Sequence, residues 1–100
     1  MCEIEFRVPR GSDLAEAEEL IERVCSAHSL KPAMKASLAS YPGSIHWHYK
    51  RGKEKGTLEL TLLRRTGRIW AQVHTNRNGA WIAEILPRVR AAIEQGLRRS

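Results

Sequence analysis

The chain reads IHWHYK at residues 45–50, TLELTLL at residues 57–63 and RIWAQVH at residues 68–74. Apolar and polar side chains alternate in all three stretches, and this period of two is typical of strands with one buried face. Short segments rich in glycine and charge separate the stretches, as expected of turns between paired strands. The pattern predicts three consecutive antiparallel strands that form a β-meander.

A further strand and a helix are predicted before the meander. Residues 3–8 alternate between charged and apolar side chains, which indicates another half-buried strand. Apolar side chains then recur at helical spacing over residues 13–29, and acidic side chains occupy the opposite face. Ser12 or Asp13 is the expected N-cap of this helix, with Glu16 completing a capping box after Asp13.

The rest of the chain adds one connection and one helix. Residues 30–43 contain two prolines and a glycine and are expected to form an ordered connection. Apolar side chains at helical spacing after an N-cap at Asn78 predict a closing helix, and Pro87 is expected to cause a kink or a restart near Leu86. The resulting order, β-α-β-β-β-α, predicts one α+β domain over residues 1–100. This domain is a two-layer sandwich with both helices on one face of the meander and the other face open. Either edge of the meander could take the first strand.

Composition and charge limit the function classes. No apolar run approaches the roughly 18 to 20 residues that span a bilayer, and acidic residues near the start argue against a secretory signal. A cytoplasmic location is therefore expected, where Cys2 and Cys25 remain reduced and act as small core side chains. Residues 1–30 have a net charge of −4 and residues 31–100 a net charge of +10. Such a basic segment favours a polyanionic partner, although the excess charge could also serve solubility alone.

Basic side chains gather at the two loops of the meander. Lys50, Arg51, Lys53 and Lys55 surround the first loop, and Arg64, Arg65 and Arg68 surround the second. The two loops lie at opposite ends of the middle strand, roughly 25 Å apart at about 3.3 Å per residue. The two groups could bind separated phosphates of a nucleic acid, or they could protect the sheet edges from aggregation.

A tryptophan is also predicted on the open face. Trp70 is expected beside Leu63 and Arg68, an arrangement that can stack a nucleobase. The same apolar side chains could instead form an interface with a protein partner, including a second copy of this chain.

Histidines form the third candidate site. Assumed loop lengths of four and two residues place Glu59 between His48 and His74 on the open face, with His46 alongside. Imidazole and carboxylate groups bind zinc and related metals, and imidazoles also act as general acids and bases. The simpler alternative is a hydrogen-bonded pair of side chains on a solvated face.

The sequence thus predicts a binding domain that contacts nucleic acid or a protein through its open sheet face and basic loops. This reading needs no cofactor. The alternative is a metal-binding protein or a histidine-based hydrolase or nuclease that uses His46, His48, Glu59 and His74.

Overall fold

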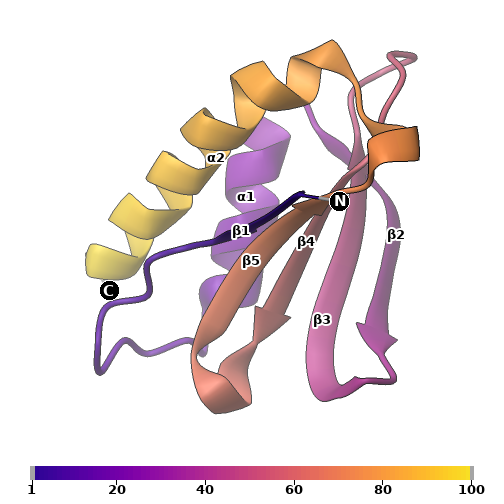
Figure 1. Ribbon diagram of the computed structural model, residues 1–100. Helices are drawn as coiled ribbons and strands as arrows, with labels where there is room; N and C mark the ends of the chain where they lie inside the picture. Colours follow the sequence, from indigo (N-terminus) through magenta and orange to yellow (C-terminus); the bar gives the residue numbers. More distant parts are fainter. Residues whose placement is uncertain (1, 100) are drawn as a thin grey trace.

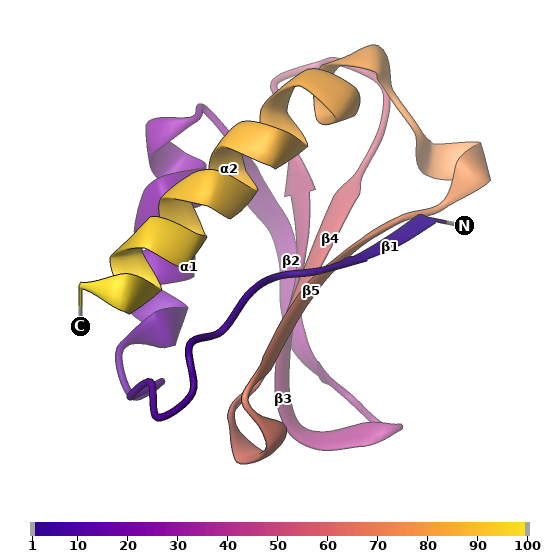
Figure 2. The same cartoon turned by 60° about the vertical axis from the view of Figure 1, so that its left-hand side comes forward.

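The computed structural model describes residues 2–99. Its elements, in chain order, are β1 (Cys2–Glu5), α1 (Ala17–Ala27), β2 (Lys31–Leu38), β3 (Tyr41–Lys50), β4 (Leu58–Leu63), the 3₁₀ turn η1 (Arg64–Thr66), β5 (Arg68–Val73), the 3₁₀ turn η2 (Thr75–Arg77) and α2 (Ala80–Arg98). All strand pairs are antiparallel, in the order β1-β5-β4-β3-β2. Both helices lie on the same side of this open sheet (Figure 1, Figure 2). The predicted α+β architecture is confirmed.

The hydrophobic core fills the space between the sheet and the helices. Trp47, Leu60 and Val73 contribute to it from β3, β4 and β5, as the alternation predicted. Ile21 of α1 and Val89 of α2 are both completely buried in the same core. The alternating face assignment therefore holds for the inner side of the sheet, and it leaves the histidines of β3 on the side away from the helices.

The predicted connection over residues 30–43 is wrong, because β2 occupies most of it. Seven of the eight residues of β2 are exposed and the eighth is half-buried. A strand with no buried face has no alternation to read in its sequence. The strand lies at the edge of the sheet, where a residue such as Pro32 costs no interior hydrogen bond. It also pairs irregularly with β3, and the hydroxyl of Ser44 accepts the Leu38 N–H at 3.0 Å where the register shifts.

Strand register is as predicted in one hairpin and shifted in the other. Between β3 and β4, Trp47 lies opposite Leu60 and His48 opposite Glu59, as a four-residue loop predicted. Between β4 and β5, however, Gln72 rather than His74 lies opposite Glu59. The connection is a 3₁₀ turn closed by Gly67 in the left-handed conformation, so it is longer than the assumed two-residue loop. The shift is two residues, which keeps every side chain on its predicted face.

Both helices begin later than predicted. The Asp13 carboxylate accepts the Ala15 N–H at 2.9 Å, which forms a local turn, and α1 then has Glu16 as its N-cap. The N-cap of α2 is Gly79 rather than Asn78. The helix also continues through Pro87, so it does not restart near Leu86.

The two cysteines differ in environment. Cys25 is buried, as predicted, and burial raises the pKa of its thiol to about 12, so it carries no nucleophilic thiolate near neutral pH. Cys2 is exposed on β1, so its assignment to the core is wrong. The reason is that β1 forms the other edge of the sheet and, within residues 2–99, pairs with β5 alone.

Neither helix within residues 2–99 is long and apolar enough to cross a membrane.

Candidate metal centre

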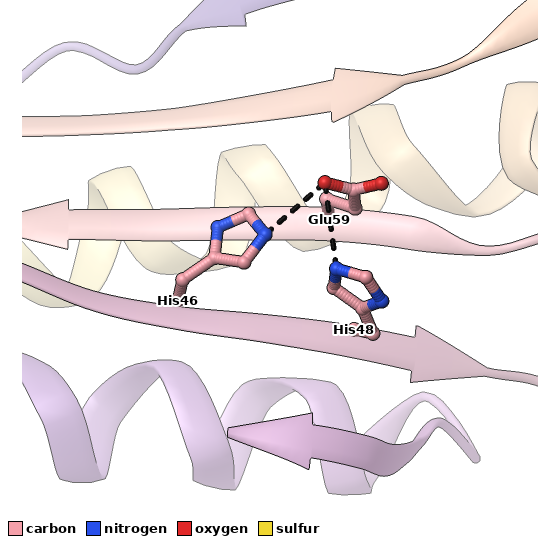
Figure 3. Close-up of side chains that lie close together, drawn as sticks. All are labelled: His46, His48 and Glu59. Carbon is pink, nitrogen blue, oxygen red and sulfur yellow. Dashed lines mark hydrogen bonds and ion pairs between the residues drawn. The ribbon is translucent and has the colours of Figure 1, made fainter. Parts of the chain in front are cut away.

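Two neighbouring strands bring two imidazoles and a carboxylate together. His46 and His48 are two residues apart on β3, so both side chains project from the face away from the helices. Glu59 of β4 is directly opposite His48 and projects from the same face. Figure 3 shows both rings directed at the carboxylate of Glu59.

The donor atoms of these side chains lie close together. His46 Nε2 is 3.1 Å from Glu59 Oε1, and His48 Nε2 is 3.5 Å from the same oxygen. One ligand atom from each of the three residues can be chosen so that all lie within 4.8 Å of one another. A single ion could therefore contact all three side chains.

The second carboxylate oxygen of Glu59 faces the segment that follows β5. His74 Nε2 is 3.2 Å from Oε2, and Nη1 of Arg77 in η2 is 4.0 Å from it. His74 reaches the carboxylate despite the register shift, because it lies just beyond β5 and approaches diagonally. It is not among the three mutually close ligands of the described residues. Its position indicates a role in orienting Glu59.

Burial sets the protonation of His46. Side-chain exposure is 4% for His46 and 7% for Glu59. Burial lowers the pKa of His46, and the nearby Glu59 carboxylate only partly offsets this effect. His46 is therefore neutral near pH 7, the form in which histidine binds metals.

A second contact holds the His46 ring in place. Its Nδ1 lies 2.7 Å from Oγ1 of Thr61, which is opposite His46 on β4. In the metal-free protein, the tautomer protonated on Nε2 satisfies both neighbours, since Nε2–H donates to Glu59 and Nδ1 accepts from the hydroxyl. If an ion takes Nε2, the proton moves to Nδ1, which then donates to Thr61 Oγ1. Such an outer hydrogen bond is the usual support of a metal-binding histidine.

The cluster lies in a depression of about 500 Å³. Besides the three histidines and Glu59, it is lined by Met34 and Leu38 of β2 and by Asn76 and Arg77. His48 and His74 remain partly exposed within it. A bound ion would therefore have one side open to an external ligand.

No family model, curated protein or solved structure matches the chain. The chemistry of the site rests on its own donor atoms and geometry.

The first group of predicted basic residues lies near this site. Lys50 is at the end of β3, two residues beyond His48 and on the same face. It is directly opposite Lys31, a residue that sequence reasoning missed because β2 itself was missed. Arg51 pairs with Glu54 at 3.2 Å, while Lys53 and Lys55 are exposed.

The second group of basic residues is largely used within the fold. Arg64 donates to the Leu14 carbonyl at 3.0 Å and pairs with Glu18, and Arg68 pairs with Glu5. Only Arg65 of this group is exposed without an ion pair among residues 2–99. The structure therefore does not join the two loops into one free basic surface.

The predicted exposure of Trp70 is wrong. Its residue exposure is 2%, because the Tyr41 ring packs edge-on against it at 5.2 Å between centroids. The guanidinium of Arg68 covers it as well, 4.2 Å from the ring centroid. Leu63 is also buried, at 3%. The sheet face without helices is thus partly closed by its own side chains, and Trp70 offers neither a stacking surface nor an apolar patch.

The metal-free protein is expected to lose stability through His46 as the pH falls below about 6.5. In the unfolded chain this imidazole takes up a proton near its ordinary pKa of 6.5. Its folded pKa is lower, so between the two values the unfolded state binds more protons and is favoured. Urea unfolding in a chelator from about pH 5 to 8 measures the effect. His46→Gln should flatten the plot of unfolding free energy against pH, and His28→Ala should not. If His46→Gln and the wild type have equal slopes in this plot, the assignment of the effect to His46 is contradicted.

Proposed function

We propose that the protein binds a divalent transition-metal ion, with Zn²⁺ the best fit, through His46 Nε2, His48 Nε2 and Glu59 Oε1. The observation that carries this proposal is that one ligand atom from each of these three residues lies within 4.8 Å of the others in a partly open depression.

The spacing of the donor atoms supports a tetrahedral ion. Ligands about 2.0–2.1 Å from zinc in a tetrahedron are about 3.3–3.4 Å from one another. The two nitrogen–oxygen distances of 3.1 Å and 3.5 Å lie on either side of that value. An ion could thus enter between the three side chains with small movements of the rings.

The type of the donors supports the same class of ion. Two imidazoles and one carboxylate suit zinc and its first-row neighbours, whereas Ca²⁺ and Mg²⁺ prefer oxygen ligands. Thr61 supports His46, while His74 and Arg77 support Glu59. Three protein ligands leave a fourth position open, as in zinc sites that act on external ligands.

Zinc uptake by the purified protein tests the proposal. Metal-stripped protein dialysed against Zn²⁺ is expected to retain one ion per chain, measured by elemental analysis. His48→Ala should lose the ion, because it removes a ligand whose side chain is 21% exposed and contributes little to the core.

His28→Ala is the matched control. His28 ends α1, where its Nδ1 contacts the Val24 carbonyl at 2.8 Å, outside the cluster. This variant should bind zinc as the wild type does, and circular dichroism should show that both variants fold. Absence of zinc from the folded wild type, or equal loss in the two variants, would overturn the proposal.

A further inference from the structure

We infer that the metal site anchors the phosphate backbone of a nucleic-acid strand, which runs from the bound ion beside Arg77 toward Lys31 and Lys50. This inference rests on the proposed metal site and names its ligand.

The charge at the site favours an anion once an ion is bound. The depression contains one carboxylate, that of Glu59, so a divalent ion leaves an excess of positive charge. The Arg77 guanidinium adds to this excess, and with 52% side-chain exposure and a contact of 4.0 Å to Glu59 it retains free donors. Arginine binds phosphate through two parallel hydrogen bonds, and a bound metal is a strong anion ligand in its own right.

Two further cations lie at the same end of the sheet. Lys31 and Lys50 are directly opposite each other on β2 and β3, a placement that repels like charges. Neither ammonium group has an ion-pair partner among the described residues. They line a hollow of about 460 Å³ together with Arg51, Lys53 and Glu54, whose carboxylate pairs with Arg51. A phosphate between the two ammonium groups would relieve their repulsion.

The strand register relates this lysine pair to Arg77. Lys50 follows Tyr49, which is opposite Leu58, so one further step along both strands reaches Thr57. The Thr57 N–H donates to the Arg77 carbonyl at 2.8 Å. Lys50 and η2 are therefore about two strand spacings apart, roughly 10 Å. This separation suits two phosphates of one chain better than a single small anion.

The walls of the depression favour a nucleotide over bare polyphosphate. Met34 is the exposed large hydrophobic residue of the described chain, at 38%, and it lines the depression with Leu38. A sugar or base attached to the metal-bound phosphate would have these apolar side chains beside it, whereas polyphosphate has no group to place there.

Fluorescence anisotropy of a labelled oligothymidylate of about ten nucleotides tests the inference, since single-strand sites cover about 4 to 16 nucleotides. Zinc-saturated protein is expected to bind at least about tenfold more tightly than metal-stripped protein, because the ion is the largest local charge. Arg77→Ala and Lys50→Ala, both saturated with zinc, should each reduce the slope of log affinity against log salt by about 0.7. Arg88→Ala should not change it, because Arg88 is exposed on α2 in the helix layer.

Each of the other possible results would overturn a specific part of the inference. The inference is overturned if the oligonucleotide binds equally well with and without zinc, or if Arg88→Ala reduces the slope as much as Arg77→Ala and Lys50→Ala do. In either case, zinc uptake by the wild type would still support the metal site. If Lys50→Ala leaves the slope of log affinity against log salt unchanged, the ligand contacts the protein through one phosphate, and the inference of a nucleic-acid strand is overturned. If tripolyphosphate competes as strongly as unlabelled oligonucleotide does, the ligand is a polyphosphate, and the inference of a nucleic acid is overturned. Failure of the wild type to take up zinc overturns both proposals.

Discussion

His46→Gln is expected to lower zinc affinity by more than about 100-fold, and Thr61→Val by about 10- to 100-fold, the range typical for loss of an outer-shell hydrogen bond. The first change removes a ligand atom. The second leaves all three ligands in place but removes the hydroxyl that lies 2.7 Å from His46 Nδ1. Competition of each variant with a zinc chelator of known affinity, at fixed pH, measures both effects.

The order of these two effects identifies the role of each residue. Thr61→Ser retains the hydroxyl and should restore most of the affinity lost in Thr61→Val. Thermal unfolding of the metal-free variants checks that each is folded. If Thr61→Val binds zinc as the wild type does, Thr61 has no outer-shell role; if His46→Gln does, His46 is not a ligand.

Trp47→Ala is expected to destabilise the protein by about 3–5 kcal/mol, the usual cost of removing a buried aromatic side chain. Trp47 is completely buried between β3 and the helices. Its Nε1–H donates to Glu22 of α1 at 3.0 Å, and its ring stacks near Tyr49 with 6.4 Å between centroids. The side chain thus joins the sheet to the first helix by packing and by a hydrogen bond. Urea unfolding gives the change in free energy.

Two further variants keep this prediction testable if Trp47→Ala does not fold. Trp47→Phe preserves most of the packing and loses the hydrogen bond, so it should cost less than the alanine variant. Met34→Ala is the exposed control on β2 and should change stability by no more than about 0.5 kcal/mol. A loss in Trp47→Phe no larger than that of Met34→Ala would show that the hydrogen bond from Trp47 to Glu22 does not help to hold α1 to the sheet.

The alternation of apolar and polar side chains along the chain was sufficient to predict the middle of the fold and half of the candidate site. Trp47 and Leu60 on one face and His48 and Glu59 on the other follow from a period of two and a four-residue loop. Each of these strands turns an alternating set of apolar side chains toward the core, so the inner face is visible in the sequence, although all six residues of β4 are buried in the structure. Because the pairing of β3 with β4 sets the distance from imidazole to carboxylate, the central pair of the site was predictable.

The residues that contact and orient the three proposed ligands were harder to predict from the sequence. Arg77 contacts Glu59 only because η2 folds back beside the start of β4, and no periodic pattern marks that turn. The four-residue loop that pairs His48 with Glu59 also puts Thr61 opposite His46, but the contact of Thr61 with Nδ1 depends on the orientation of the ring. Contacts of this kind depend on the path of a loop and on side-chain rotamers.

The sequence by itself determined the α+β class, the β3–β4 register and the face that carries the histidines, because these depend on local alternation. Tertiary structure decided the exposed strand β2, the two-residue shift of β5, the covering of Trp70 and the opposition of Lys31 and Lys50. Each of these depends on which segments meet across the sheet. Burial of a side chain by distant residues leaves no periodic signal in its own neighbourhood.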